Sequence, residues 1–283
     1  MNKYEDEEII HLKNKNLEYL QFRVLNDYNV KHCITLRHGG VSSGEYKSLN
    51  FRTLGNDKIE NVFKNLDIIK NELSFGDICK GKQDHTDRVI IIDEDNKDNY
   101  LFKNLNQEKV DGYVVSSPNI ATLITTADCN PIIIYDKAKN VVANVHAGWK
   151  GVINKIYINA INIMKRKYNS NVNDLIVCIG PSIRNCCFTS KEDAFKEKFI
   201  SAFSYSNEYL YYNQDGTFHI DLVKILAHEL KKVGVLEENI HVADICTRCN
   251  TDDFFSYRYA VQNNKKDYAT MATIVQISEN NVK

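Results

Sequence analysis

The stretch between residues 120 and 147 constrains the fold of this chain most strongly. It holds three short apolar runs, IATLI, IIIYD and VVANV, each typical of a strand bounded by turn residues. The first two runs are separated by TTADCNP, which places Asp128 and Cys129 before a proline. Asp is depleted in strands, and Pro131 cannot donate a ladder hydrogen bond, so we expect a turn between two strands. A pair of core strands gains nothing from this interruption. We therefore infer that the turn has a function that needs the cysteine.

Helix and strand patterns alternate along the rest of the chain. Apolar residues recur at helical spacing in 57–74, where Asp57 is the expected cap, and in 151–168. Further helices are expected over 219–234 and from about 190 to 203. The other expected strands are 31–40, which ends in a glycine turn, 87–93, 139–148, 173–180, 239–246 and 270–277. The pattern predicts an α/β fold with mixed β-sheets and flanking helices.

We expect one catalytic domain over residues 1–283, in which residues 1–28 form a peripheral N-terminal segment. That N-terminus is charged throughout and has no apolar core, which argues against a signal peptide. The 36 basic and 37 acidic residues nearly balance, so the chain lacks the electrostatic footprint of a nucleic-acid binder. No apolar run approaches the ~18 residues of a membrane helix. We therefore expect a cytoplasmic protein whose eight cysteines are reduced.

Three potential metal ligands stand at the ends of expected strands: His85, Cys129 and His146. A catalytic zinc ion takes three protein ligands of these types and keeps one open position. Their spacing matches no structural zinc finger, so three unrelated polar residues at strand ends remain an alternative. Asp128 could orient a histidine or accept a proton, or it could bond its own backbone as a turn acid.

A second group of cysteines is less suggestive in the sequence. Cys246 and Cys249 form a C-x-x-C motif, which on its own indicates redox or zinc chemistry. A structural zinc site would need a second pair. The nearest candidates, Cys186 and Cys187, are adjacent rather than spaced. The sequence therefore does not favour a separate metal site here.

Several long motifs carry a resemblance to a known family: LRHGGVSSGEYKSLNF, KQDH, TTADCNPIII, NVHAGWKGV, IGPSIRNCCF and DICTRC followed by DDFFSYR. In this order they resemble the YfiH-type family, also called laccase-domain or multicopper polyphenol oxidoreductase proteins. The resemblance runs from about residue 30 to 275. It implies a layered αββα sandwich, and a metal site of His85, Cys129 and His146 that holds zinc, with copper possible. It also implies purine nucleoside phosphorolysis with accompanying adenosine deamination.

This implied chemistry assigns roles to further residues. Phosphate would attack the ribose C1′ of adenosine, inosine or methylthioadenosine as the purine departs. Arg37 and Arg258 are candidate phosphate clamps because a guanidinium fits two phosphate oxygens, and Lys150 is a third candidate. For deamination, a zinc-activated water would attack C6 of adenosine, and Asp128 would shuttle protons.

The chain departs from the family at three places that bear on substrate preference. Tyr259 stands where a second arginine usually follows FFSYR, and no glycine comes before Met271. Lys150 replaces the commoner arginine of the HAGW motif, and Arg184 stands where a glycine is common.

Different functions remain open from the sequence. A copper-dependent oxidase of phenols needs many paired histidines, and this chain has eight His without an H-x-H pair. A cysteine hydrolase would use Cys129 as nucleophile and His146 as base. A third possibility is a partner-binding protein that keeps the fold without activity. The sequence does not indicate an oligomeric state.

Overall fold

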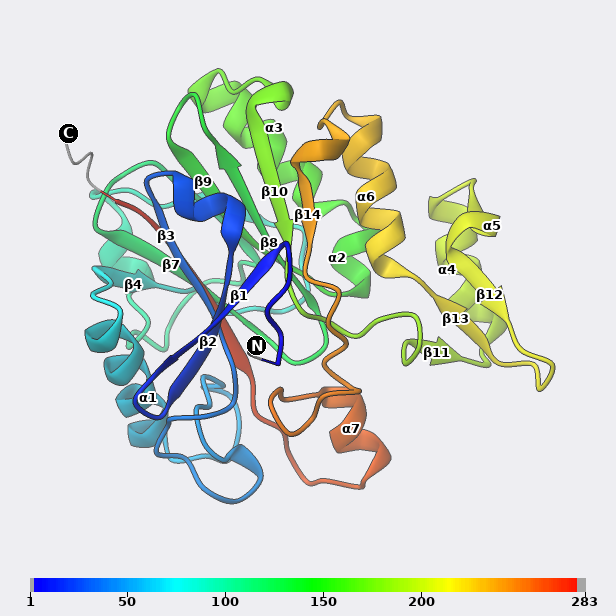
Figure 1. The fold of residues 1–283 in the computed structure, drawn as a ribbon, viewed down its shortest axis with the longest axis horizontal. Coiled ribbons are helices and arrows are strands. Elements are labelled where there is room, and N and C mark those ends of the chain that lie inside the picture. The colour runs from blue at the N-terminus through cyan, green and yellow to red at the C-terminus, as the bar shows by residue number, and fades with distance from the viewer. Residues whose placement is uncertain (1–2, 279–283) are drawn as a thin grey trace.

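The computed structural model describes residues 3–278, which form two six-stranded β-sheets and a small three-stranded sheet (Figure 1). The first sheet has the order β1-β2-β3-β15-β7-β4, the second β14-β10-β8-β9-β6-β5, and the small sheet β11-β13-β12. The strands of the first sheet are β1 (Ile9–Asn14), β2 (Leu17–Phe22), β3 (Val30–Thr35), β4 (Asp77–Cys79), β7 (Ile120–Thr126) and β15 (Met271–Ile277). Those of the second are β5 (Val89–Ile91), β6 (Gly112–Val115), β8 (Asn130–Asp136), β9 (Val141–Ala147), β10 (Leu175–Ile179) and β14 (Ile240–Val242). The small sheet contains β11 (Thr189–Ser190), β12 (Leu210–Tyr212) and β13 (Phe218–Ile220).

The two large sheets face each other, and helices cover their outer faces. Ile124 and Val275 of the first sheet share one buried cluster with Ile133 and Val142 of the second. α1 (Ile59–Glu72) covers the outer face of the first sheet, while α3 (Ile156–Tyr168) and α6 (Leu222–Lys232) cover that of the second. The remaining helices are α2 (Trp149–Ile153), α4 (Asp193–Ala202), α5 (Ser206–Tyr209) and α7 (Tyr257–Gln262). The layers form an αββα sandwich, which confirms the predicted fold class.

The N-terminal segment contributes to the edge of the first sheet. β1 and β2 pair in antiparallel register from Ile9 opposite Phe22 to Asn14 opposite Leu17. Ile9, Leu20 and Phe22 are fully buried in the inter-sheet core. The described part of segment 1–28 thus forms a hairpin at the edge of the sheet whose apolar side chains are buried in the core. Its charged sequence conceals these buried positions.

Two predictions about helices were wrong in detail. The helix expected over 151–168 is divided into α2 and α3, because Lys155 adopts a left-handed conformation with φ of 57°. Asp57 does not cap α1. Lys58 occupies that position without a side-chain cap bond, and the Asp57 carboxylate accepts hydrogen bonds from Ser42 and Asn50 at 2.6 and 2.9 Å.

A lateral unit extends beyond α6, where Figure 1 shows α4, α5 and the small sheet together. Its aromatic side chains join the core of the second sheet; Phe199, Phe203 and Tyr209 are fully buried there. None of the helices among the described residues is long and apolar enough to span a membrane.

Candidate active site

The three predicted ligands meet in one place. His85 lies in the loop between β4 and β5 with a φ of 56°, Cys129 lies between β7 and β8, and His146 is in β9. Their ligand atoms all lie within 4.8 Å of one another, and Cys129 Sγ is 3.6 Å from His85 Nε2. β7 belongs to the first sheet and β8 to the second, so the turn at Cys129 joins the sheets. The three residues are called the trio below.

Asp111 organises the trio from a fully buried position just before β6. His146 Nδ1 donates a hydrogen bond of 2.8 Å to Asp111 Oδ1, which leaves the Nε2 of His146 for the trio. The same carboxylate accepts the backbone N–H of His85 at 3.2 Å, and the N–H and hydroxyl of Thr86 at 2.7 Å each. A carboxylate that orients a histidine in this way is typical of metal sites and of acid–base pairs. Asp111 was not predicted from the sequence, because only its place before an apolar strand distinguishes it.

Charges within the trio oppose the effect of burial on its pKa values. Burial alone would raise the pKa of the Cys129 thiol, but His146 and His85 lower it to about 6. Burial alone would lower the pKa of His146, but Cys129 and Asp111 raise it to about 9. Burial would raise the pKa of Asp111, yet His146 and Thr86 lower it to about 2. The charges of the trio therefore favour the thiolate form of Cys129 and the protonated form of His146.

Gly148 is required for the close approach of two trio members. A Cβ at this position would lie 2.6 Å from His85 Cδ2 and 3.0 Å from Cys129 Sγ, so a larger residue would displace both. The next residue, Trp149, packs edge-on against Phe195 with ring centroids 5.1 Å apart. The sequence NVHAGWKG thus supplies a ligand, the space for two others and an aromatic wall.

Asp128 lies beside the trio but bonds away from it. Its φ of 89° places it in a left-handed turn conformation, and its carboxylate is buried. The Thr247 hydroxyl donates to Oδ1 at 2.6 Å, while the Ser256 hydroxyl and the Arg258 N–H donate to Oδ2 at 2.9 and 2.7 Å. Burial raises the pKa of Asp128 against these hydrogen bonds. The carboxylate therefore anchors the segment before α7 to the trio's turn.

The donor set of the trio fits a metal ion. A tetrahedral zinc ion with Zn–S of about 2.3 Å and Zn–N of about 2.0–2.1 Å separates sulfur from nitrogen by about 3.6 Å. That separation matches the distance between Cys129 Sγ and His85 Nε2. Because His146 Nδ1 is hydrogen-bonded to Asp111, its Nε2 is the nitrogen that remains for a metal ion. Two histidines and a cysteine can also hold copper.

The trio lies in a pocket of about 560 Å³, within the range of small-molecule sites. Five aromatic side chains line it: Trp149, Phe188, Phe195, Tyr257 and Tyr268. Four basic side chains line it as well: Arg52, Lys80, Lys150 and Arg258. Asp128 is the one carboxylate among these lining residues, and its oxygens are engaged as described. The pocket therefore suits an anionic ligand that also has an aromatic part.

Two of the three predicted phosphate ligands line the pocket, and the third does not. Arg258 lines the pocket, and the hydrogen bonds that its side chain donates within residues 3–278 all come from Nη1, to the carbonyls of Cys187 and Thr189 and to the Thr189 hydroxyl. Lys150 also lines the pocket, with its Nζ 5.7 Å from the centroid of Trp149. Arg37 is not among the lining residues. Its three nitrogens donate to the carbonyls of Lys47 and Thr251, so it joins two loops.

Two basic residues of the pocket were not predicted from the sequence. Lys80 is buried, its Nζ donates to the carbonyl of Gly81 at 3.0 Å, and burial lowers its pKa to about 8. Arg52 pairs with Asp267 at 2.5 Å and lies 4.0 Å from the centroid of Tyr268. Nothing in the neighbouring sequence marks either residue, because the fold alone brings them to the wall of the pocket.

Fold and site together define an αββα protein with a pocket that can hold a metal ion on one cysteine and two histidines. The chain belongs to the family described as multi-copper polyphenol oxidoreductase laccase, whose model matches residues 31–278. The resemblance drawn from the sequence motifs is thereby confirmed.

Relatives and solved structures agree with this placement. The chain is 29% identical over 252 residues to a purine nucleoside phosphorylase of Bacteroides thetaiotaomicron, covering 86% of this chain and 92% of the relative. It is 34% identical over 205 residues to purine nucleoside phosphorylase CA_C1699 of Clostridium acetobutylicum, covering 72% and 77%. In fold it is similar to the hypothetical protein YfiH of Bacillus licheniformis, with a TM-score of 0.86 at 24% identity over 96% of this chain and 100% of the other. YlmD of Geobacillus stearothermophilus gives the same TM-score and coverage at 22% identity.

Proposed function

We propose that this chain is a purine nucleoside phosphorylase. It would convert adenosine, inosine or methylthioadenosine and phosphate to the free base and a ribose 1-phosphate. The observation that carries this proposal is the pocket, which surrounds the trio with basic side chains for phosphate and aromatic rings for a base. The printed names of the relatives from Bacteroides thetaiotaomicron and Clostridium acetobutylicum support it. Because these substrates are metabolites of the cytoplasm, the proposal includes a cytoplasmic location.

In this reaction a phosphate oxygen forms a bond to the ribose C1′ while the bond from C1′ to the base nitrogen breaks. The departing base keeps the electron pair and takes up a proton. Arg258 and Lys150 are the side chains that we assign to phosphate, because both line the pocket and carry positive charge. Positioning and charge stabilisation of this kind supply much of the rate enhancement in such transfers.

The protonation of the base falls to the trio or to Lys80. Asp111 fixes His146 through Nδ1 and keeps a proton on that side of the ring. Lys80 has a pKa of about 8, close to the range in which a general acid works best. We propose zinc as the metal of the trio, with copper possible. When bound, the metal would supply a Lewis acid toward an oxygen or nitrogen atom in the pocket.

We propose adenosine deamination as an accompanying activity at the same trio. It replaces the C6 amino group of adenosine with an oxygen from water and releases ammonia. Asp128 is our candidate for moving the proton, although three donors hold its carboxylate. Asp128→Asn would keep the size of the side chain while removing its basicity, and loss of inosine formation with normal folding would support the role.

A cysteine hydrolase is the second candidate, and the geometry of the trio favours it specifically. Cys129 lies beside His146, which in turn is held by Asp111 at 2.8 Å, in the order nucleophile, base and orienting acid. The pKa of about 6 for Cys129 would make the nucleophile a thiolate. Alkylation of Cys129 in metal-free protein, with loss of amidase activity, would favour this candidate.

A phenol oxidase and a non-enzymatic binding protein have less support. Of the two ligand clusters found among residues 3–278, the trio alone contains histidine, which gives little basis for a multicopper oxidase of phenols. A lack of visible absorption after copper loading would count against such an oxidase. A non-enzymatic binding protein would show a filled metal site and no turnover.

Chromatography of the products formed from adenosine, with and without phosphate, tests the proposal. Adenine that appears only with phosphate, together with ribose 1-phosphate, would establish the phosphorylase. Inosine formed without phosphate would establish the deaminase. Folded, metal-loaded protein that forms neither product would overturn both.

A further inference from the structure

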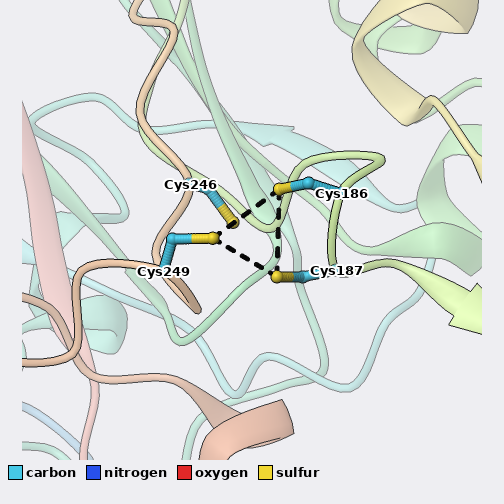
Figure 2. Close-up of side chains that lie close together, drawn as sticks. All are labelled: Cys186, Cys187, Cys246 and Cys249. Atoms are coloured by element: carbon cyan, nitrogen blue, oxygen red, sulfur yellow. Dashed lines mark hydrogen bonds between the residues drawn. The ribbon is translucent and has the colours of Figure 1, made fainter.

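A second cluster of potential metal ligands lies outside the trio. Figure 2 shows the sulfur atoms of Cys186, Cys187, Cys246 and Cys249 facing one another from two loops. All four sulfurs lie within 4.8 Å of one another. These residues are called the cysteine cluster below.

The topology explains how residues so far apart in the sequence converge. Cys186 and Cys187 follow β10, and Cys246 and Cys249 follow β14. The two strands pair in parallel, with Ile179 opposite Val242, so their carboxyl ends meet at the same edge of the sheet. A further bridge between Ser182 and Cys246 continues this pairing into the loops. The arrangement is therefore part of the sheet geometry.

The sulfur separations match a tetrahedral metal ion. Cys186 Sγ lies 3.8 Å from Cys187 Sγ and 3.7 Å from Cys249 Sγ, and the last two are 3.4 Å apart. With a Zn–S distance of about 2.3 Å, the edge of a zinc–sulfur tetrahedron is about 3.8 Å. A disulfide needs about 2.05 Å, so none of these pairs is bonded. Three of the free cysteines are thus spaced close to the edges of such a tetrahedron, and Cys246 Sγ lies within 4.8 Å of each of them.

Polar groups around Cys246 suit a thiolate at that position. The backbone N–H of Arg184 points to Cys246 Sγ at 3.5 Å, and Asn250 Nδ2 donates to the carbonyl of Cys246 at 2.9 Å. Four thiolates and Zn²⁺ carry a net charge of −2. The buried guanidinium of Arg184 pairs with Asp244 at 3.7 Å and also interacts electrostatically with Cys246 and Cys186, so it offsets part of this charge.

We propose that the cysteine cluster binds one zinc ion as a closed structural site. Binding would replace the thiol protons and join the loop after β10 to the loop after β14. The loop after β10 carries Phe188, which lines the pocket, and the loop after β14 leads into α7, which carries Arg258 of the pocket lining. Arg258 Nη1 donates to the carbonyl of Cys187 at 2.9 Å. The zinc would therefore hold the phosphate-binding side of the pocket from outside.

The test isolates this site in the full chain. In Cys129→Ala/His146→Ala the trio loses two ligands while the cysteine cluster is intact. This variant, purified anaerobically and loaded with Zn²⁺ alone, is expected to keep one zinc per chain by mass spectrometry. X-ray absorption should show sulfur neighbours alone at about 2.3 Å. Absence of that zinc, or nitrogen and oxygen neighbours in its place, would overturn the proposal.

A matched pair of variants and a measurement on the unmodified chain complete the test. Adding Cys246→Ser/Cys249→Ser should remove the zinc, whereas adding Cys178→Ala, a buried cysteine outside the cluster, should not. In the unmodified protein, zinc should slow alkylation of all four cluster cysteines, and a chelator should restore it. Disulfide-linked peptides from protein trapped anaerobically would contradict the proposal, whether or not the serine variant folds.

Discussion

The trio and the cysteine cluster differ in ligand number, surroundings and exposure to the pocket. The trio offers two imidazoles and one thiol inside a basic, aromatic pocket, so a bound metal would keep an open position. The cysteine cluster offers four sulfurs between two loops, which would close the coordination shell. One region is therefore suited to chemistry and the other to holding a pocket wall in place. Variants that change one region and spare the other should separate these two roles.

Cys129→Ala should lower kcat/KM for phosphorolysis by about 10²- to 10⁴-fold, the range for loss of a group that acts directly on the reaction. Zinc at the cysteine cluster should remain. Steady-state kinetics and metal analysis on the same sample measure both effects. Cys79→Ala, which changes a buried cysteine outside the pocket, is the control. Full activity in Cys129→Ala would remove the thiol from the mechanism.

Arg258→Ala should raise the KM for phosphate by about 10- to 100-fold, because a charge-assisted hydrogen bond contributes about 1.5–3 kcal/mol. Arg37→Ala is the matched control. It should destabilise the fold by about 1–3 kcal/mol through its lost carbonyl contacts and leave the KM nearly unchanged. Initial rates at varied phosphate and urea unfolding measure the two effects. The opposite pattern would show that Arg37 is the phosphate ligand.

Asp111→Asn should weaken zinc binding at the trio by about 10- to 100-fold, the usual cost of losing a carboxylate that orients a metal-bound histidine. Competition with a chromophoric chelator measures this affinity. Zinc in the cysteine cluster should be unaffected, since Asp111 contacts His146 and the loop at His85. Equal weakening at both sites would indicate general unfolding.

The pH dependence of Cys129 alkylation should show its lowered pKa. In metal-free protein the rate should rise with pH as the thiolate forms, with a midpoint at about 6. His146→Ala removes the main charge that lowers this pKa, so the midpoint should move up toward the ordinary thiol value of about 8.5. An unchanged midpoint would show that the charge of His146 does not lower the pKa of Cys129.

Local patterns predicted much of the fold. The helix over 57–74 and the strands around TTADCNP could be predicted because their apolar residues follow the period of the element. The break at Lys155 could not, since its left-handed conformation leaves the apolar pattern of 151–168 intact. The prediction that Asp57 caps α1 was wrong because Ser42 and Asn50, which precede the helix and do not belong to its pattern, donate hydrogen bonds to the Asp57 carboxylate.

The trio and the cysteine cluster also differed in how far they could be predicted from the sequence. The trio could be proposed because each member stands at a strand end or a glycine turn, where side chains converge. The cysteine cluster depends on the parallel pairing of β10 with β14, and adjacent Cys186 and Cys187 gave no ligand spacing. Asp111 reaches His146 of the trio, and Lys80 reaches the pocket, for the same non-local reason.

We propose that the pocket around the trio transfers a ribosyl group to phosphate. Phosphorus NMR of the zinc-loaded chain with adenosine and phosphate tests it most directly. We predict that the phosphate signal falls while a ribose 1-phosphate signal rises in equal amount, and that neither changes without nucleoside. A constant phosphate signal in folded, metal-loaded protein would contradict the account.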